Sequence, residues 1–241
     1  MLNVENAKIC ATLSKLVYQK KEVVLETLEK DFEQCDFFDN DGTQCLLAAN
    51  EDKIFVVFRG TEPTAWEDVK ADLNFFKVKA DTAGRVHGGF KESCDDLYEE
   101  IRLKILLLRT HEKQQIIISG HSLGAAVATL FASRIKADQL YTFGSPRVGD
   151  KRFVNTLCVP HWRFVNNNDI VTFVPPILMF YHDGELKYFN SKQQLSTGGF
   201  LERVYDRALG YISAWKKLKF FDGISDHDMG TYEKLVHGLQ S

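Results

Sequence analysis

The sequence predicts an α/β protein with a mostly parallel central sheet flanked by helices on both faces. Short β-branched runs such as Ile116–Ile118 alternate with longer segments whose apolar residues recur at helical spacing. This alternation favours parallel pairing, because each helix carries the chain back to the same edge of the sheet. No repeat, low-complexity stretch or linker interrupts the 241 residues, so we expect a single domain over 1–241.

The first half of the chain predicts helices, a hairpin and a further helix. Apolar spacing predicts helices over 4–18 and 22–32. The segments TQCLLAAN and KIFVVFRG flank the turn residues Asn50–Asp52, which is typical of a β-hairpin. A long helix over 91–108 follows, with Leu97, Ile101 and Ile105 on one side.

The second half repeats the pattern of strands and helices. We expect a buried strand over 115–119, a helix over 122–136, and strands at DQLYTFG and HWRFVN. The segments ILMFYHDG and ELKYFN predict an antiparallel pair with its turn at Asp183-Gly184. The tail from about residue 200 predicts helix, with a break near 221–226.

Composition excludes several classes of protein. A net charge of −3 without a basic tail gives no general attraction for nucleic acid, and the apolar runs are too short for a transmembrane helix. The five cysteines lack CxxC spacing, which argues against a zinc site and a full disulfide framework. The N-terminus MLNVENAKIC lacks the features of a signal peptide, so we expect reduced thiols and a cytoplasmic location, or secretion if a leader was removed.

The run ISGHSLGAA has the G-x-S-x-G pattern between a β-branched strand and an alanine-rich helix. Such an elbow holds its serine in a strained conformation beyond the strand end, beside the positive end of a helix. Side chains at 120 and 124 would collide with the neighbouring strand and helix, which accounts for Gly120 and Gly124. We therefore predict Ser122 as a nucleophile.

A serine nucleophile needs a general base oriented by a carboxylate, and in folds with this elbow the acid and then the histidine follow the serine. Chain order or position within a predicted element excludes six histidines: His87, His111, His121, His161, His182 and His237. His227, in the loop segment GISDHDMGTY, is therefore the predicted base.

Asp169 is the predicted acid, because it follows the end of the strand HWRFVN. Asp138 and Asp150 are earlier alternatives, whereas Asp226 and Asp228 are also explained as loop or capping residues.

Acyl transfer also requires donors for the developing oxyanion. The residue after the nucleophile, Leu123, offers its backbone N–H, and Thr61 at the end of FVVFRGT offers an N–H and a hydroxyl. Helix capping is the alternative role for Thr61, because the capping-box pattern Thr64–Glu67 follows closely.

Six motifs together resemble the class 3 lipases, the fungal-lipase-like α/β-hydrolases. They are FRGTEP, VHGGF, GHSLGAA, YTFGSPRVG, NNNDIV and DHDMGTY, spread over about residues 40–235. The resemblance implies an α/β-hydrolase fold, a Ser122–Asp169–His227 triad, and oxyanion donors at Thr61 and Leu123. It also implies ester hydrolysis without a metal or organic cofactor.

In this family the segment after the oxyanion loop often forms a lid, which makes 62–77 a candidate lid segment. Trp66, Val69, Leu73 and Phe76 recur there at helical spacing and are candidates for substrate contact. An ordinary surface helix packed on the core is the alternative. A second amphipathic helix is predicted over 200–220. Its apolar side is suited to contact a membrane surface, to line the acyl pocket or to pack on the core, and consists of Leu201, Val204, Tyr205, Ala208, Ile212 and Trp215.

The resemblance leads us to expect a serine hydrolase that cleaves fatty-acyl esters, most of all acylglycerols. Its expected partner is a lipid or ester substrate at a membrane or oil–water interface, and its oligomeric state stays open. The alternatives are a phospholipase A1, a short-chain or aromatic carboxylesterase, transfer of the acyl group to another alcohol, and a non-catalytic lipid-binding or scaffold protein on the same fold.

Overall fold

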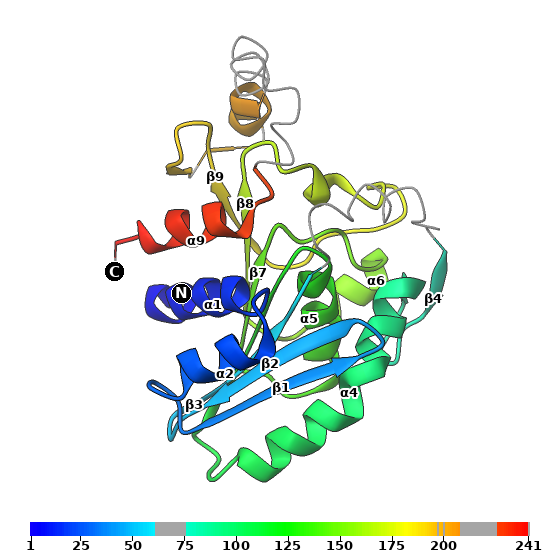
Figure 1. The fold of residues 1–241 in the computed structure, drawn as a ribbon. Coiled ribbons are helices and arrows are strands. Elements are labelled where there is room, and N and C mark those ends of the chain that lie inside the picture. The colour runs from blue at the N-terminus through cyan, green and yellow to red at the C-terminus, as the bar shows by residue number, and fades with distance from the viewer. Residues whose placement is uncertain (61–75, 197, 200, 208–225, 241) are drawn as a thin grey trace.

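The computed structural model describes residues 1–60, 76–196, 198–199, 201–207 and 226–240. Figure 1 shows one twisted sheet with helices on both sides. The fold class predicted from the sequence is confirmed. No helix within the described ranges is long and apolar enough to cross a bilayer.

The main sheet has eight strands in the order β1-β2-β3-β6-β7-β8-β9-β10. They are β1 (Gln34–Asn40), β2 (Thr43–Ala49), β3 (Lys53–Phe58), β6 (Gln115–His121), β7 (Gln139–Phe143), β8 (His161–Asn166), β9 (Glu185–Phe189) and β10 (Leu195–Ser196). Neighbours from β3 to β9 pair in parallel, while β1, β2 and β10 join antiparallel at the two edges. The short strands β4 (Lys77–Lys79) and β5 (Arg85–His87) form a separate antiparallel pair.

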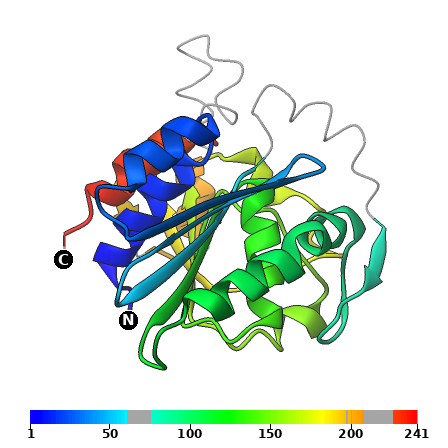
Figure 2. The ribbon, with the colours of Figure 1, turned by 60° about the horizontal axis from the view of Figure 1, so that its bottom comes forward.

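Two layers of helices cover the sheet. The helices are α1 (Val4–Leu16), α2 (Lys21–Leu28), α4 (Gly88–Leu108), α5 (Leu123–Arg134), α6 (Lys151–Val154), the 3₁₀ helix η2 (Ile170–Phe173) and α9 (Met229–His237). Residues 201–207 are also helical. Figure 2 shows α1, α2 and α9, in blue and red, on one face and the green α4 and α5 on the other.

Alternation along the strands builds a hydrophobic core on each face. In β3, Val56 and Phe58 pack with α4 and α5, whereas Phe55 and Val57 pack with α1, α2 and α9. Successive side chains of a strand point to opposite faces, so a strand buried on both sides is apolar throughout. All five cysteines are free, and Cys10, Cys45 and Cys94 are buried in these cores.

The helices α1 and α9 lie side by side although they come from opposite ends of the sequence (Figure 1). Thr12 Oγ1 lies 2.9 Å from His237 Nε2, and Lys15 Nζ lies 2.7 Å from Glu233 Oε2. These contacts hold α9 against α1, and α9 begins at Met229, two residues after His227.

Two parts of the sheet differ from the sequence-based prediction. Strand β1 was not expected, and it pairs with β2 through a tight turn at Asp41-Gly42. The predicted antiparallel pairing of 177–184 with 185–190 is wrong, because β9 pairs in parallel with β8. Residues 177–180 instead form a turn in which Met179 and Phe180 donate backbone N–H groups to the Pro176 carbonyl.

Candidate active site

Ser122 lies at the turn between β6 and α5. Its backbone has φ 59° and ψ −130°, a strained conformation for a residue with a side chain. A Cβ atom on Gly120 would collide with the Gly124 carbonyl, and one on Gly124 with the Phe58 carbonyl. The two glycines therefore allow α5 to start directly against β6 and β3, which leaves the serine at the carboxyl end of the sheet.

The structure brings the hydroxyl, imidazole and carboxylate expected from the sequence into one row. Ser122 Oγ lies 2.8 Å from His227 Nε2. His227 Nδ1 lies 3.0 Å and 2.9 Å from the two carboxylate oxygens of Asp169. All three residues are buried. An ionised carboxylate only accepts, so His227 Nδ1 carries the proton and Nε2 is free to accept the serine proton.

Asp169 is held in its ionised form. Burial alone would raise its pKa, but the neighbouring His227 ring and the hydrogen bonds from His227 and Tyr232 outweigh that effect and lower it. The Tyr232 hydroxyl donates to Asp169 Oδ2 at 2.6 Å, and the backbone N–H of Val171 donates to Oδ1 at 2.9 Å. These donors favour the charged form of the carboxylate.

The loops that carry the acid and the base are joined to each other. The backbone N–H of Asn168 donates to the Asp226 carboxylate at 3.0 Å, and the Asn166 side chain donates to the Asp226 carbonyl at 3.0 Å. Asp228 caps α9 by accepting from the Thr231 N–H at 2.8 Å. The loop and capping roles considered for Asp226 and Asp228 are thus the ones that the structure shows.

Gly144, which follows β7, lies beside the contact between acid and base. It has a φ of +57°, and a Cβ atom there would lie 2.6 Å from Asp169 Oδ2 and 2.8 Å from His227 Nδ1. The glycine of the motif YTFGSPRVG therefore leaves the room in which the carboxylate and the imidazole meet.

The remaining candidate residues have separate outcomes. Leu123 is the first residue of α5, and the N–H groups of a first helical turn have no acceptor within the helix. Thr61, Trp66, Val69 and Leu73 lie outside the described residues, as do Ala208, Ile212 and Trp215. Phe76 is described; it is half-exposed and precedes β4 rather than lying in a helix.

The carboxylates considered as alternatives to Asp169 have structural roles. Asp138 accepts the backbone N–H of Ile116 at 2.7 Å, and Asp150 caps α6 through the N–H of Phe153 at 2.9 Å. Neither contact involves His227.

The histidines His161 and His182 also lie apart from Ser122. His161 bridges the Thr142 hydroxyl at 2.8 Å and the Asp183 carboxylate at 2.9 Å, and the cavity beside it measures only about 10 Å³. His182, which lies outside any strand, contacts the Thr172 carbonyl at 2.8 Å. The row Thr142–His161–Asp183 repeats the order of groups of the candidate site, but the cavity lined by His161 and Asp183 is too small for a substrate.

Sequence reasoning missed three residues around His227: Tyr18, His121 and Tyr232. His121 was excluded as a base by chain order, but its ring stacks on His227. Tyr232 belongs to the motif DHDMGTY, so a signal for it existed. Tyr18 had none, because it lies 103 positions before its partner His121.

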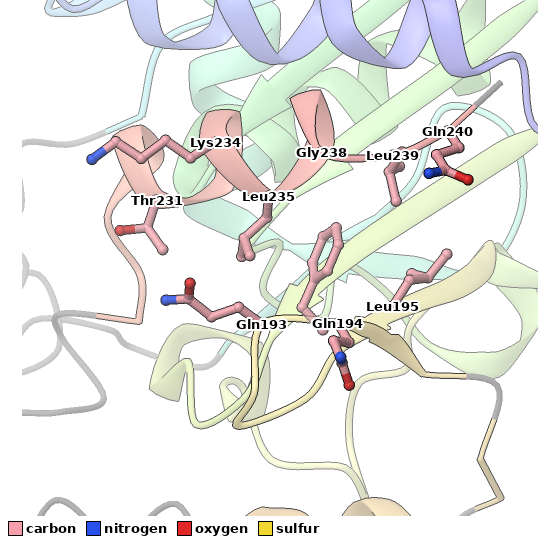
Figure 3. A pocket seen from close by; sticks show the side chains of 10 residues that line it. Gln193, Gln194, Leu195, Thr231, Lys234, Leu235, Gly238, Leu239 and Gln240 are labelled. Carbon is pink, nitrogen blue, oxygen red and sulfur yellow. The ribbon is translucent and has the colours of Figure 1, made fainter.

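A groove of about 700 Å³ opens elsewhere, between α9 and the β9–β10 turn (Figure 3). Gln193, Leu195, Lys234 and Leu235 contribute to its lining. None of the three residues of the hydroxyl–imidazole–carboxylate row lines it, so this groove is separate from the candidate site.

Comparison with known proteins agrees with the geometry. The family described as Lipase (class 3) matches residues 55–179, just over half of the chain. A lipase of Rhizomucor miehei is 34% identical over 152 residues, which cover 56% of this chain and 41% of that protein. A secreted mono- and diacylglycerol lipase of Fusarium solani is 30% identical over 149 residues, covering 58% and 40%.

Among solved structures, the triacylglyceride lipase of Rhizomucor miehei superimposes with a TM-score of 0.65 at 27% identity, over 77% of this chain and 80% of that one. The chain spans about two fifths of the length of the two curated relatives. The family match, the shared fold and the arrangement around Ser122 lead to one conclusion: this chain belongs to the class 3 lipase family.

Proposed function

We propose that this protein is a serine hydrolase that cleaves carboxylic esters of fatty acids, above all acylglycerols. The observation that carries the proposal is the row Ser122–His227–Asp169, with 2.8 Å between hydroxyl and imidazole and 2.9 Å between imidazole and carboxylate. The names of the relatives, which include mono- and diacylglycerol and triacylglyceride lipases, support the substrate class.

In the proposed mechanism, Ser122 attacks the ester carbonyl while His227 Nε2 takes its proton. Asp169 keeps the imidazole in the required tautomer and stabilises the imidazolium that forms. The Leu123 N–H and Thr61 bind the oxyanion, and His227 then protonates the departing alcohol. Water, activated by the same imidazole, attacks the acyl-enzyme and releases the fatty acid.

Covalent labelling tests the nucleophile. An alkyl phosphonate should label wild-type protein at Ser122, and Ser122→Ala should lose both labelling and turnover. Ser133→Ala is the matched control, because Ser133 lies on α5 but donates only to the Leu130 carbonyl among the contacts described. Mass spectrometry locates the label. Labelling at another residue, or turnover by Ser122→Ala, would refute the assignment.

A series of esters of increasing chain length tests the substrate class. Glycerol esters should be hydrolysed faster once their concentration exceeds the solubility limit. A preference for short soluble or aromatic esters would make the protein a carboxylesterase instead. Release of fatty acid from position 1 of phospholipids in preference to acylglycerols would make it a phospholipase A1.

We also propose that the protein works at a lipid surface. Exposed apolar side chains near the site support this proposal. Leu178 and Leu201 are 89% and 80% exposed, and Ile177 is exposed as well. The Arg207 guanidinium lies 4.5 Å from the centre of the Phe173 ring, which places helix 201–207 beside η2, the element that follows Asp169.

Vesicle binding tests the lipid surface. Leu178→Glu should weaken sedimentation with phosphatidylcholine vesicles and slow hydrolysis of emulsified glycerol esters, yet leave hydrolysis of a soluble ester unchanged. Leu107→Glu is the control. Leu107 is 81% exposed, and it lies at the end of α4, which precedes the start of β6, whereas the candidate site follows the end of β6. Equal vesicle binding by both variants would contradict the proposal.

A cytoplasmic location stays a prediction. The relative from Fusarium solani is named as secreted. Fractionation of cells that express the full-length protein with a C-terminal tag distinguishes the two locations: activity in the cell extract agrees with the prediction, and activity in the medium contradicts it.

A further inference from the structure

His121, the residue before Ser122, contacts both the ring and the main chain of His227. The ring centroids are 4.5 Å apart, with 30° between the ring planes. His121 Nε2 lies 2.8 Å from the His227 carbonyl oxygen, and His121 Nδ1 lies 2.8 Å from the Tyr18 hydroxyl. His121 is only 2% exposed, so little water competes for these contacts.

These contacts determine the proton positions on His121. A carbonyl oxygen can only accept, so Nε2 must carry a proton and donate it to the His227 carbonyl. Burial, together with the nearby His227, lowers the pKa of His121 to about 3, so the ring is neutral at ordinary pH. Nδ1 of the neutral ring has no proton and accepts, so the Tyr18 hydroxyl donates to it.

Tyr18 is itself held between α1 and the elbow. It follows the C-cap residue of α1, and the Arg59 guanidinium lies 5.2 Å from the centre of its ring. A Cβ atom on Gly60 would lie 2.6 Å from the Tyr18 hydroxyl oxygen and 2.9 Å from Ser122 Cβ. The phenol thus reaches the immediate surroundings of the nucleophile from the N-terminal helix.

We propose that Tyr18 and His121 are positioning residues for His227: His121 donates to the His227 carbonyl, and the Tyr18 hydroxyl, by donating to Nδ1, stabilises the His121 ring in that tautomer and orientation. Together with the Asp169 contact at Nδ1, this bond fixes residue 227 at its main chain and at its ring, with Nε2 aimed at Ser122. The proposal rests on the hydrolase function proposed above and adds two residues to it.

The tautomer matters because the alternative is repulsive. If His121 carried its proton on Nδ1, its Nε2 lone pair would face the lone pairs of the His227 carbonyl. A neutral ring also stacks against His227 without charge repulsion when His227 becomes an imidazolium. Loss of the Tyr18 hydroxyl therefore leaves the fold in place but lowers the fraction of His227 rings that are correctly oriented.

Tyr18→Phe tests this proposal, with Tyr141→Phe as the matched control. The Tyr141 hydroxyl donates to Gln139 Oε1 at 2.6 Å and lies 3.3 Å from the carbonyl oxygen of Asn3, the N-cap of α1, so it is a phenol of the sheet whose contacts do not involve His227. Tyr18→Phe should lower kcat on a soluble ester and the rate of phosphonate labelling of Ser122 by about three- to ten-fold, the effect of one hydrogen bond. KM should stay unchanged, and Tyr141→Phe should match wild type in both rates.

Two substitutions of His121 separate the hydrogen bond from the ring stacking. His121→Gln keeps an N–H donor for the His227 carbonyl, whereas His121→Phe keeps an aromatic ring and loses the donor. The Gln variant should label faster than the Phe variant when both are compared below their melting temperatures.

Wild-type rates in Tyr18→Phe with only a lowered melting temperature would overturn the proposal, as would faster labelling of the Phe than of the Gln variant. Failure of the proposed hydrolase function is distinguishable from these results, because the wild-type protein would then not be labelled at Ser122.

Discussion

Among single residues, Asp169 shows most clearly how the surroundings of a side chain set its chemistry. Its carboxylate receives hydrogen bonds from a backbone N–H, a phenol and an imidazole, although it is completely buried. A buried carboxylate without such donors would be protonated more easily and would orient the imidazole less well. The donors around Asp169 should therefore affect turnover without touching the substrate.

Tyr232→Phe removes the phenol that donates to Asp169. We expect kcat to fall by about ten-fold, the effect of one hydrogen bond to a charged group, and the pKa of Asp169 to rise. Tyr188→Phe is the control, because Tyr188 is also buried and donates to Asp206, a carboxylate outside the row. Steady-state kinetics on a soluble ester compare the variants, and equal rates for both would contradict this role of Tyr232.

His227→Ala and His182→Ala should behave very differently. Removal of the general base should reduce kcat by roughly 10³-fold or more. His182 contacts only the Thr172 carbonyl among the hydrogen bonds described, so its loss should leave kcat within a few-fold of wild type. The kinetics of both variants on one soluble ester decide the matter, and an essential His182 would show that the base is misassigned.

At the scale of the elements, α5 approaches β3 and β6 closely because glycine, which has no side chain, stands at the contact. Gly124→Ala places a methyl group against the Phe58 carbonyl and the backbone of Arg59. We expect the free energy of unfolding to fall by about 1–3 kcal/mol, the usual effect of overpacking a core. Urea denaturation measures it.

Gly199→Ala is the control for this experiment, because a Cβ atom there meets nothing within 4 Å. If Gly124→Ala unfolded at the same urea concentration as Gly199→Ala, the backbone would not be as tightly packed at the elbow as the structure indicates.

The elements that the sequence predicted well are those whose pattern is local. Strand β6, the elbow and α5 follow from adjacent β-branched, glycine and alanine residues. Strand β1 was missed because QCDFFDN mixes apolar with acidic and amide residues, as an edge strand allows, although Asp41-Gly42 is a hairpin signal. The predicted pairing of β9 was wrong because its actual neighbour in the sheet, β8, lies 19 residues or more upstream, beyond the reach of a local pattern.

The same distinction between local and long-range information applies to the site. Ser122, Asp169 and His227 each lie in a recognisable local context, and chain order then relates them. Tyr18 and His121 contribute through contacts between distant segments, which no short motif records.

At the scale of the whole molecule, several buried histidines should make the fold sensitive to acid. Burial lowers the pKa of His87 to about 4 and also lowers the pKa of His161 and His182. An unfolded histidine takes up a proton near pH 6.5. Between pH 6.5 and 4 the unfolded chain therefore binds protons that the folded His87 does not, so stability falls as the pH falls through this window.

We expect the melting temperature to drop between pH 7 and pH 5, and His87→Phe to reduce that drop. Phenylalanine keeps the stacking on Phe90, whose ring lies 4.2 Å from that of His87, and has no group to protonate. His111→Gln is the control, because His111 is exposed. Thermal unfolding at several pH values measures the effect, and an unchanged pH dependence in His87→Phe would contradict it.

The pairing of α1 with α9 has a consequence for refolding. The proposed nucleophile, Ser122, and the proposed general base, His227, are 105 residues apart in the sequence, and His227 directly precedes the N-cap of α9, the helix that packs beside α1. Contacts between such distant segments form slowly because the loop that joins them must first close. After dilution from denaturant, turnover should therefore recover more slowly than the far-UV circular dichroism signal of the β-sheet. Turnover would then report the completion of folding.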